Sequence, residues 1–430
     1  MKSPARTRLD RGNCWLPLVW CGLFAATVAG AADLPSKPPA AVFDEEMSGY
    51  RRTEPSGAVT ALQKRIERGE AKLVFDAKQG YLPSLLRELA LPASSQLLVF
   101  SKTSPLRHFI SPHNPRALYF NDHVWLAYVP DAPNIELAAA DPRLGVAFYT
   151  VEQKASSAPA PVRDDRCLEC HATAKTLGVP GLLVRSFLTD QEGDVDLLSG
   201  RSINHRTPIA ERWGGYYVTG QHGNQPHLGN LFGAEPIAKH RRDPLANGNL
   251  ADLRRFLDTS KYPGPGSDLI ALLVLDHQVH MHNLLTRLGY EAQAALRDAG
   301  TLTPAAPAVE AVLKYLLFAE EAPMGSAVAG SSAFASAFEK AGPRDKQGRS
   351  LRQFDLQTRL FKFPCSFMIY SESWSNLPAA ARKRLYKRLW DVLNGEDASP
   401  EFRHLGADTR RALREILTET KNDLPAWWAL

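Results

Sequence analysis

The period of the hydrophobic positions changes along the chain, which predicts strands in its first half and helices in its second. Apolar residues recur at helical spacing over 59–70 and 82–91. Short runs rich in aromatic and β-branched residues follow, and turn residues separate them. We therefore expect a β region, with strands at 96–101, 117–121, 124–129, 135–139, 146–153, 182–188 and 215–219.

Beyond residue 250 the apolar positions keep a helical period. A short helix is expected at 251–257 and a long one over 267–299, with Ser267 as N-cap, Gly289 as a candidate break and Gly300 as the end. Further helices are expected at 304–321, 332–340, 378–394 and 407–421. The predicted fold class is α+β, in which a β-containing N-terminal and central part precedes an all-α C-terminal region.

The first 31 residues have the layout of an export signal. A basic segment from Lys2 to Arg11 precedes an apolar stretch from Trp15 to Val28, and Ala29-Gly30-Ala31 forms a small-residue cleavage site. An uncleaved anchor helix is the alternative, although Pro17 interrupts the stretch, which is short for a membrane span. We expect cleavage after Ala31 and a mature chain without a transmembrane span.

Composition and charge limit the range of partners. The chain is 44% hydrophobic and 23% charged, which is typical of globular proteins. Its net charge is +5, of which +3 lies in residues 1–31, where four basic residues face one acidic residue, so the remainder carries +2. This near balance gives no reason to expect nucleic acid or an anionic membrane as a partner.

The cysteines point to a specific chemistry. Two of the five precede the cleavage site, and the other three, Cys167, Cys170 and Cys365, are too few for a disulfide framework. Cys365 is flanked by large apolar residues and is predicted to be a buried, unreactive thiol. Cys167 and Cys170 stand three apart, and His171 follows directly.

The string Cys167-Leu168-Glu169-Cys170-His171 is a C-x-x-C-H motif, which indicates attachment of a c-type haem. On a helix each residue turns about 100°, so the two thiols and the imidazole project from one face. There the thiols can form thioethers with the haem vinyl groups while His171 ligates the iron. A thioredoxin-like pair, half of a zinc site and a chance disulfide remain as alternatives. The single motif predicts one covalent haem c per chain.

By this motif the chain resembles c-type cytochromes. Longer strings resemble a group of exported bacterial proteins described as cytochrome c domain-containing, to which no reaction is assigned. The resemblance implies haem binding and a periplasmic location, and it rests on residues 117–122, 212–220, 276–278, 281–283 and 363–366. The chain departs from small cytochromes c because no Met occurs between Met47 and Met281, so a distal Met at the usual spacing is absent.

Two histidine groups are candidates for the distal side of the haem iron or for a second metal. His222 and His227 lie in a glycine-rich loop that can approach a haem closely. The others, His277, His280 and His282, lie in the long predicted helix. Because His282 is about 140° round the helix from His277, these three cannot bind one ion without distortion of the helix. They are also candidates for a proton relay.

Other residues are weaker candidates for contacts with a haem. Arg201 and Arg206 could pair with haem propionates, although solvated arginines are the more common case. The aromatic residues Trp213, Tyr216 and Tyr217 could wall a haem, although a strand-face core is the simpler interpretation.

We therefore expect an exported mono-haem cytochrome that transfers one electron at a time to or from a redox partner protein or a small donor or acceptor. A haem enzyme of the peroxidase or oxidase kind, with an open distal site, is the first alternative. A haem-based sensor or binding module is the second. The expected regions are a signal peptide (1–31), an N-terminal α+β region (32–160), a mono-haem region (161–250) and a helical C-terminal region (251–430).

Overall fold

The structure is a computed structural model that describes residues 48–155 and 159–429. The predicted signal peptide at 1–31 lies outside the described residues. All described residues belong to one compact unit. The division into regions at 160 and 250 stays a prediction. Among the described residues, no helix is both long enough and apolar enough to cross a membrane.

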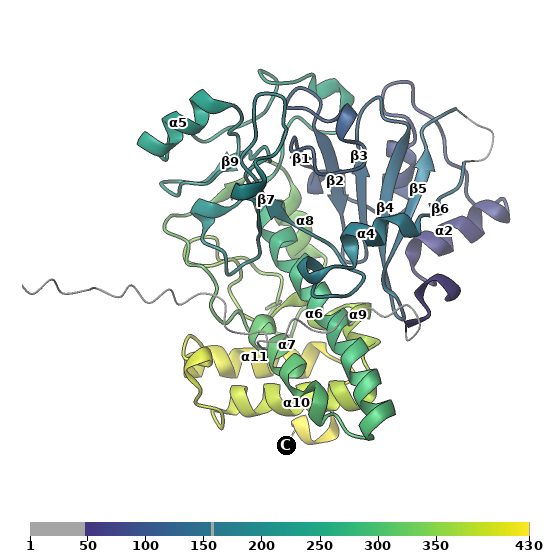
Figure 1. Cartoon of the computed structure of the whole chain (residues 1–430). Helices are drawn as coiled ribbons and strands as arrows, with labels where there is room; N and C mark the ends of the chain where they lie inside the picture. Colours follow the sequence, from purple (N-terminus) through teal and green to yellow (C-terminus); the bar gives the residue numbers. More distant parts are fainter. Residues whose placement is uncertain (1–47, 156–158, 430) are drawn as a thin grey trace, which may run out of the picture. The chain divides into compact units, whose positions relative to one another are not determined.

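A six-stranded antiparallel sheet forms the first half of the fold, and its strands follow one another in sequence order (Figure 1). The five strands predicted between residues 96 and 153 are confirmed, and a sixth, short strand is added. The strands are β1 (Leu97–Val99), β2 (Arg116–Phe120), β3 (Val124–Tyr128), β4 (Asn134–Asp141), β5 (Gly145–Glu152) and β6 (Val162–Arg163).

The two faces of this sheet differ in what covers them. One face carries Tyr119, Leu126, Leu137 and Tyr149, which are all buried. Helix α2 (Ala58–Glu67) packs on this side, where Thr60 hydrogen-bonds to the Tyr149 hydroxyl at 2.8 Å. The other helix predicted in this part is also confirmed, as α3 (Leu82–Glu88).

The opposite face carries a row of directly paired residues that runs from Phe120 through Trp125 and Ala138 to Phe148. This face is called the site face below. Leu118 and Ala127 form a second pair on the same face, two residues from Phe120 on β2 and from Trp125 on β3. Both are only partly buried. The same register places Glu136 and Thr150 in one row with Leu118 and Ala127, and both are partly buried. The site face therefore carries apolar and polar side chains and is incompletely covered.

The long predicted helix is confirmed as α6 (Leu269–Ala299). Its N-cap is Asp268 rather than Ser267, because the Asp268 carboxylate accepts hydrogen bonds from the amides of Ile270 and Ala271. Gly289 does not divide the helix, which continues to Gly300, whose φ of 66° ends it. Nearly all of its first half is buried, consistent with a helix in the centre of the fold.

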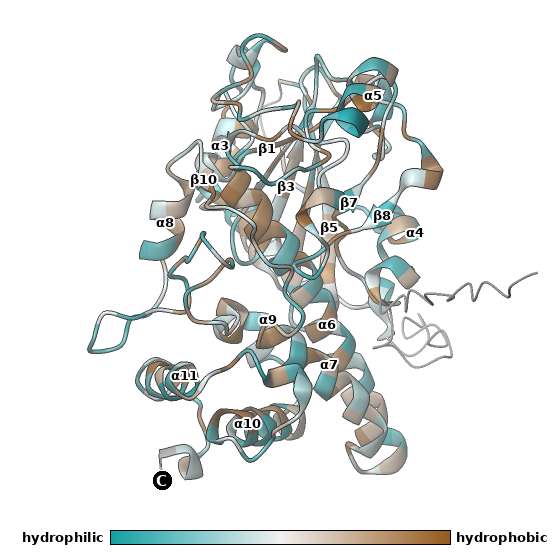
Figure 2. Ribbon diagram, turned by 90° about the vertical axis from the view of Figure 1, so that its left-hand side faces the viewer, coloured by the Kyte–Doolittle hydropathy of each residue, from teal (hydrophilic) through white to brown (hydrophobic). Residues whose placement is uncertain are grey.

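The other C-terminal helices match the prediction closely. Helix α7 packs along α6, and both carry hydrophobic stretches (Figure 2). Three short helices were not predicted: α4 (Leu168–His171), α5 (Ala234–Arg242) and α9 (Glu372–Ser375). The confirmed helices are α7 (Ala306–Leu316), α8 (Phe334–Lys340), α10 (Ala379–Asn394) and α11 (Ala407–Thr420).

Three predicted elements are wrong or much shorter. Residues 251–257 form turns, since seven residues hold few helical bonds and the amide of Leu253 bonds to Pro265 instead. Residues 215–219 do not form a strand, because Trp213 and Gly215 both take positive φ and turn the chain there. Of 182–188, only β7 (Arg185–Ser186) is extended, paired with β8 (Arg201–Ser202).

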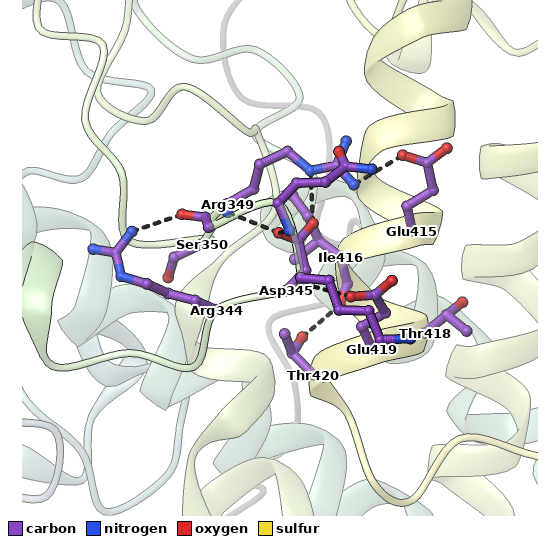
Figure 3. A network of polar contacts seen from close by, with 12 residues as sticks. Arg344, Asp345, Arg349, Ser350, Glu415, Ile416, Thr418, Glu419 and Thr420 are labelled. Carbon is purple, nitrogen blue, oxygen red and sulfur yellow. Dashed lines mark hydrogen bonds and ion pairs between the residues drawn. The ribbon is translucent and has the colours of Figure 1, made fainter.

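Ion pairs fasten the loop after α8 to the last long helix (Figure 3). Arg349 bonds to Asp345 at 2.6 Å and to Glu415 on α11 at 2.8 Å. The amide of Lys346 donates to Glu419 on the same helix. These contacts hold α11 against the rest of the fold at a distance from the candidate site.

Candidate functional site

The C-x-x-C-H motif forms a short turn of helix on the site face of the sheet. The Asp164 side chain caps the preceding turn by accepting from the amide of Arg166, and Leu168 buries its side chain in the core. The amide of Asp164 donates to the carbonyl of Phe148 on β5, which fixes α4 against the sheet (Figure 1). Cys167 is half-buried, Cys170 is exposed, and both are free thiols.

His171 is held in one tautomer. Its Nδ1 atom lies 2.9 Å from the carbonyl oxygen of Gly181, and its ring centroid lies 5.0 Å from that of Phe148. Because a carbonyl only accepts, Nδ1 carries the proton and Nε2 keeps its lone pair. Burial lowers the pKa of His171, which keeps the ring neutral at pH 7. A neutral imidazole oriented in this way is ready to ligate a metal through Nε2.

The segment that carries the Gly181 carbonyl, which accepts from His171, is itself held by the central helix α6. Asn283 on α6 accepts from the amide of Leu182 at 3.0 Å and donates to the carbonyl of Leu182 at 2.8 Å. A Cβ atom at Gly181 would collide with the Asn283 side-chain oxygen, so this position requires glycine. The orientation of His171 is thus set by α6 through residues 181 and 182.

The donor set fits a c-type haem. Two free thiols and one neutral imidazole with an available nitrogen leave the same helical turn, which lies on the partly covered site face against Phe148. A thioredoxin-like pair fits less well, because burial together with Asp164 and Glu136 raises the pKa of Cys167 to about 12. A redox pair of that kind needs a thiol whose pKa is lowered.

His222 and His227 lie close to each other in the loop that contains them, with ring centroids 4.5 Å apart, and both are buried. They hold opposite tautomers. Nδ1 of His222 faces the Gln225 carbonyl at 2.8 Å, so its Nε2 has the lone pair. Nδ1 of His227 accepts from the Gly229 amide at 3.0 Å, so its Nε2 carries the proton. Both Nε2 atoms are buried without a hydrogen-bond partner in the described part of the chain.

The three histidines of α6 turn toward three different surroundings. His277 bonds through Nδ1 to His205 at 2.8 Å and through Nε2 to Ser366 at 2.6 Å. The ring of His280 lies 4.7 Å from that of Tyr315. His282 donates from Nε2 to the Gly145 carbonyl at 3.2 Å and accepts at Nδ1 from Ser373 at 3.1 Å. Both nitrogens of His277 and of His282 are therefore engaged.

The structure does not gather these histidines around His171. Its described neighbours are Phe148 and Gly181, and none of the five candidates makes a ring contact or hydrogen bond with it. Within residues 48–155 and 159–429, no group of three or more His, Cys, Asp or Glu side chains is arranged to hold a metal ion. The five histidines thus form separate polar sites within the core.

A buried ion pair beside these histidines was not predicted from sequence. Asp276 on α6 accepts from Trp213 at 3.0 Å and pairs with Arg212 at 3.3 Å, and both charged side chains are almost fully buried. Burial raises the pKa of Asp276 to about 6, while Arg212 acts in the opposite direction. The sequence does show an acidic residue, Asp276, within an apolar helix and an adjacent Arg212-Trp213 pair. It does not show that these residues are in contact.

The two arginines proposed as propionate partners are engaged elsewhere. Arg201 pairs with Glu211 on the surface. Arg206 pairs with Glu320 at 3.5 Å, and its guanidinium lies over the ring of Tyr315. Trp213, Tyr216 and Tyr217 are buried in the main core, as the simpler interpretation predicted, although they do not lie on a strand.

Comparison with protein-family models, curated proteins and solved structures gives no match. The resemblance to c-type cytochromes therefore rests on the sequence strings alone.

Proposed function

We propose that the chain is a mono-haem c-type cytochrome, with thioether attachment at Cys167 and Cys170 and iron ligation by His171. One observation carries the proposal: the contact of His171 Nδ1 with the Gly181 carbonyl leaves Nε2 free beside two free thiols on one helical turn. When bound, the haem supplies one-electron exchange between ferric and ferrous iron.

One-electron transfer is the activity that this arrangement supports best. The exposed thiol of Cys170 places one attachment point at the protein surface. A haem held there presents an edge to a redox partner protein or to a small donor or acceptor. Leu168 and Phe148 hold the motif rigidly against the sheet, so little rearrangement is needed when the iron changes charge.

A haem enzyme with an open distal side is the second candidate. It is favoured by the tautomers of the histidines, since His227, His277 and His282 have no unengaged lone pair to offer the iron. If no other side chain ligates, the sixth position accepts small molecules.

We also propose that the protein is exported to the periplasm and cleaved after Ala31. The signal-like composition of residues 1–31 supports this, as does the chemistry of covalent haem attachment, which bacteria carry out outside the cytoplasm. N-terminal sequencing of purified holoprotein checks it. Ala32 is the expected first residue, and Met1 on a membrane-bound holoprotein would favour the anchor instead.

Spectroscopy of the purified holoprotein distinguishes the two candidate functions. For a carrier we expect low-spin ferric iron by electron paramagnetic resonance, no Met-ligand absorption band and a reversible one-electron reduction. High-spin ferric iron that reacts with peroxide and binds carbon monoxide when reduced would contradict the carrier and support the enzyme. Holoprotein of Cys365→Ala serves as the control for cysteine replacement, because this third thiol is fully buried away from the motif.

A further inference from the structure

Two arginines near the motif have no acidic partner. Within the described residues, the guanidinium groups of Arg116 and Arg185 make no hydrogen bond or ion pair, and the Nε atom of each is buried without a partner. Other buried arginines of this chain do have carboxylates: Arg212 pairs with Asp276, and Arg352 pairs with Asp122. A partly buried cation without a counter-charge is costly, which suggests that a further anion belongs there.

Strand register places Arg116 on the site face. Every second residue of a strand projects to the same face, so Arg116 lies on the same face as Leu118 and Phe120 of β2. Phe120 begins the row of paired residues that ends at Phe148, whose ring lies against that of His171. Arg116 also lies directly opposite Val99 on β1, and Val99 forms a bridge on its other side with Tyr216. Opposed residues in a sheet project to the same face, so Arg116 and Tyr216 share the face that bears the motif.

Arg185 approaches the same place from β7. The amide of Phe187 donates to the Gly214 carbonyl at 2.9 Å, and the Gly214 amide donates to the hydroxyl of Ser186 at 2.9 Å. These bonds hold β7 beside the turn that leads into Tyr216. The Arg185 guanidinium stacks on the ring of Phe187 at 4.3 Å, which fixes its orientation.

Charge effects agree with this placement. Burial raises the pKa of Tyr216 to about 12, and the nearby charges of Arg116 and Arg185 both oppose this rise. Burial lowers the pKa of Arg185, as expected for a cation without a nearby acid. The two cations therefore both act at Tyr216, which lies on the site face through its bridge to Val99.

We infer that Arg116 and Arg185 bind the two propionate carboxylates of the haem. The inference rests on the proposed haem attachment. A haem carries its two propionates on one edge, and the planar guanidinium fork matches a carboxylate in geometry and charge. This assignment replaces Arg201 and Arg206, whose charges are already paired.

The test compares holoproteins of Arg116→Gln, Arg185→Gln, Arg116→Lys and the control Arg201→Gln. A cation beside the propionates stabilises ferrous over ferric iron, so its removal lowers the midpoint potential. We expect the potential to fall in Arg116→Gln and Arg185→Gln, to fall further in the double variant, and to recover partly in Arg116→Lys. The control should match the wild type. In resonance Raman spectra, the propionate bending band should shift to lower frequency in the two Gln variants alone.

The possible outcomes separate this inference from the proposed function. Covalent haem in the wild type, with an unchanged potential and propionate band in both Gln variants, overturns the arginine assignment only. A wild type without covalent haem overturns both. Because the haem is attached through cysteines, loss of an arginine does not release it, and far-ultraviolet circular dichroism shows whether each variant is folded. If a Gln variant fails to fold, the Lys variant and the other single variant still decide.

Discussion

The Nδ1 atom of His171 lies 2.9 Å from the carbonyl oxygen of Gly181, and this one contact determines which ring nitrogen is available. Residues 181 and 182 are in turn held by Asn283 on α6. The motif contributes the imidazole and the thiols, whereas a helix more than a hundred residues later sets the orientation of the imidazole. The consequences can be tested by changing residues that do not touch the motif.

The first prediction concerns Asn283→Ala. The substitution removes two buried hydrogen bonds to Leu182, each worth about 1–2 kcal/mol once the unpaired backbone groups are included. We expect a stability loss of about 2–4 kcal/mol on that basis, measured by chemical denaturation. Weaker support of Gly181 also makes His171 less basic, so the midpoint potential of the holoprotein should rise. The exposed Asn224→Ala is the matched control, and equal behaviour of the two variants would refute the link from α6 to His171.

A second prediction follows from the histidine tautomers. His227→Ala, His277→Ala and His282→Ala should leave the ferric spin state of the holoprotein unchanged, since none of these rings offers an unengaged lone pair. His222→Ala and His280→Ala complete the series and test the two rings that remain. Conversion of low-spin to high-spin iron in any of the first three variants would show that the histidine rearranges when haem is bound.

The buried pair of Arg212 and Asp276 provides a third prediction. Asp276→Asn and Arg212→Met should each cost about 3–5 kcal/mol, because each leaves a buried polar partner uncompensated. The double variant should lose clearly less than the sum, which denaturant titration of all four proteins measures. Simple additivity would mean that the two side chains do not stabilise one another.

The fourth prediction is loss of stability in mild acid. Burial lowers the pKa of four histidines to about 3 (His227, His277) or about 4 (His280, His282), below the ordinary value of about 6.5. Between pH 6.5 and 4, the unfolded chain therefore binds protons that the folded chain does not, so stability falls as the pH falls. Asp276, whose pKa is raised to about 6, acts in the opposite sense over the same window.

Burial also lowers the pKa of His205 well below its usual value and raises that of Glu321 to about 7, and these two groups act in opposite senses. Each proton that only the unfolded chain binds contributes about 1.4 kcal/mol per pH unit, so a net of about three protons gives roughly 4 kcal/mol per unit near pH 5. His282→Asn should reduce this slope by about one proton, whereas the exposed His108→Asn should not. Denaturant titrations at pH 7, 6 and 5 measure the slope. A slope that is the same in wild type and His282→Asn would contradict the buried, neutral state of His282.

Much of the fold could be predicted because its pattern is local. The alternation in β2 to β5 and the helical period of α6 and α10 identify elements whose buried faces repeat along the sequence. The predictions for 215–219 and 251–257 were wrong. The first segment depends on positive φ at Trp213 and Gly215, and the second on a hydrogen bond from the Leu253 amide to the Pro265 carbonyl. Such features follow from the tertiary structure rather than from local period.

Some residues of the candidate site could likewise be predicted from local sequence, and others could not. Cys167, Cys170 and His171 could be named from sequence because their spacing alone carries the chemistry. Arg116 and Arg185 could not, because nothing local distinguishes an arginine without a partner from one that is paired. That distinction requires knowing where every carboxylate lies. Arg201 and Arg206, named from sequence only as weaker candidates, are paired with Glu211 and Glu320.

The intact mass of the purified protein after acid–acetone extraction tests the central claim most directly. We predict the mass of residues 32–430 plus one haem, retained in Cys365→Ala and lost when Cys167 and Cys170 are both replaced by Ala. A wild-type protein without the added mass, or a double variant that keeps its haem through the extraction, would contradict covalent attachment at this motif.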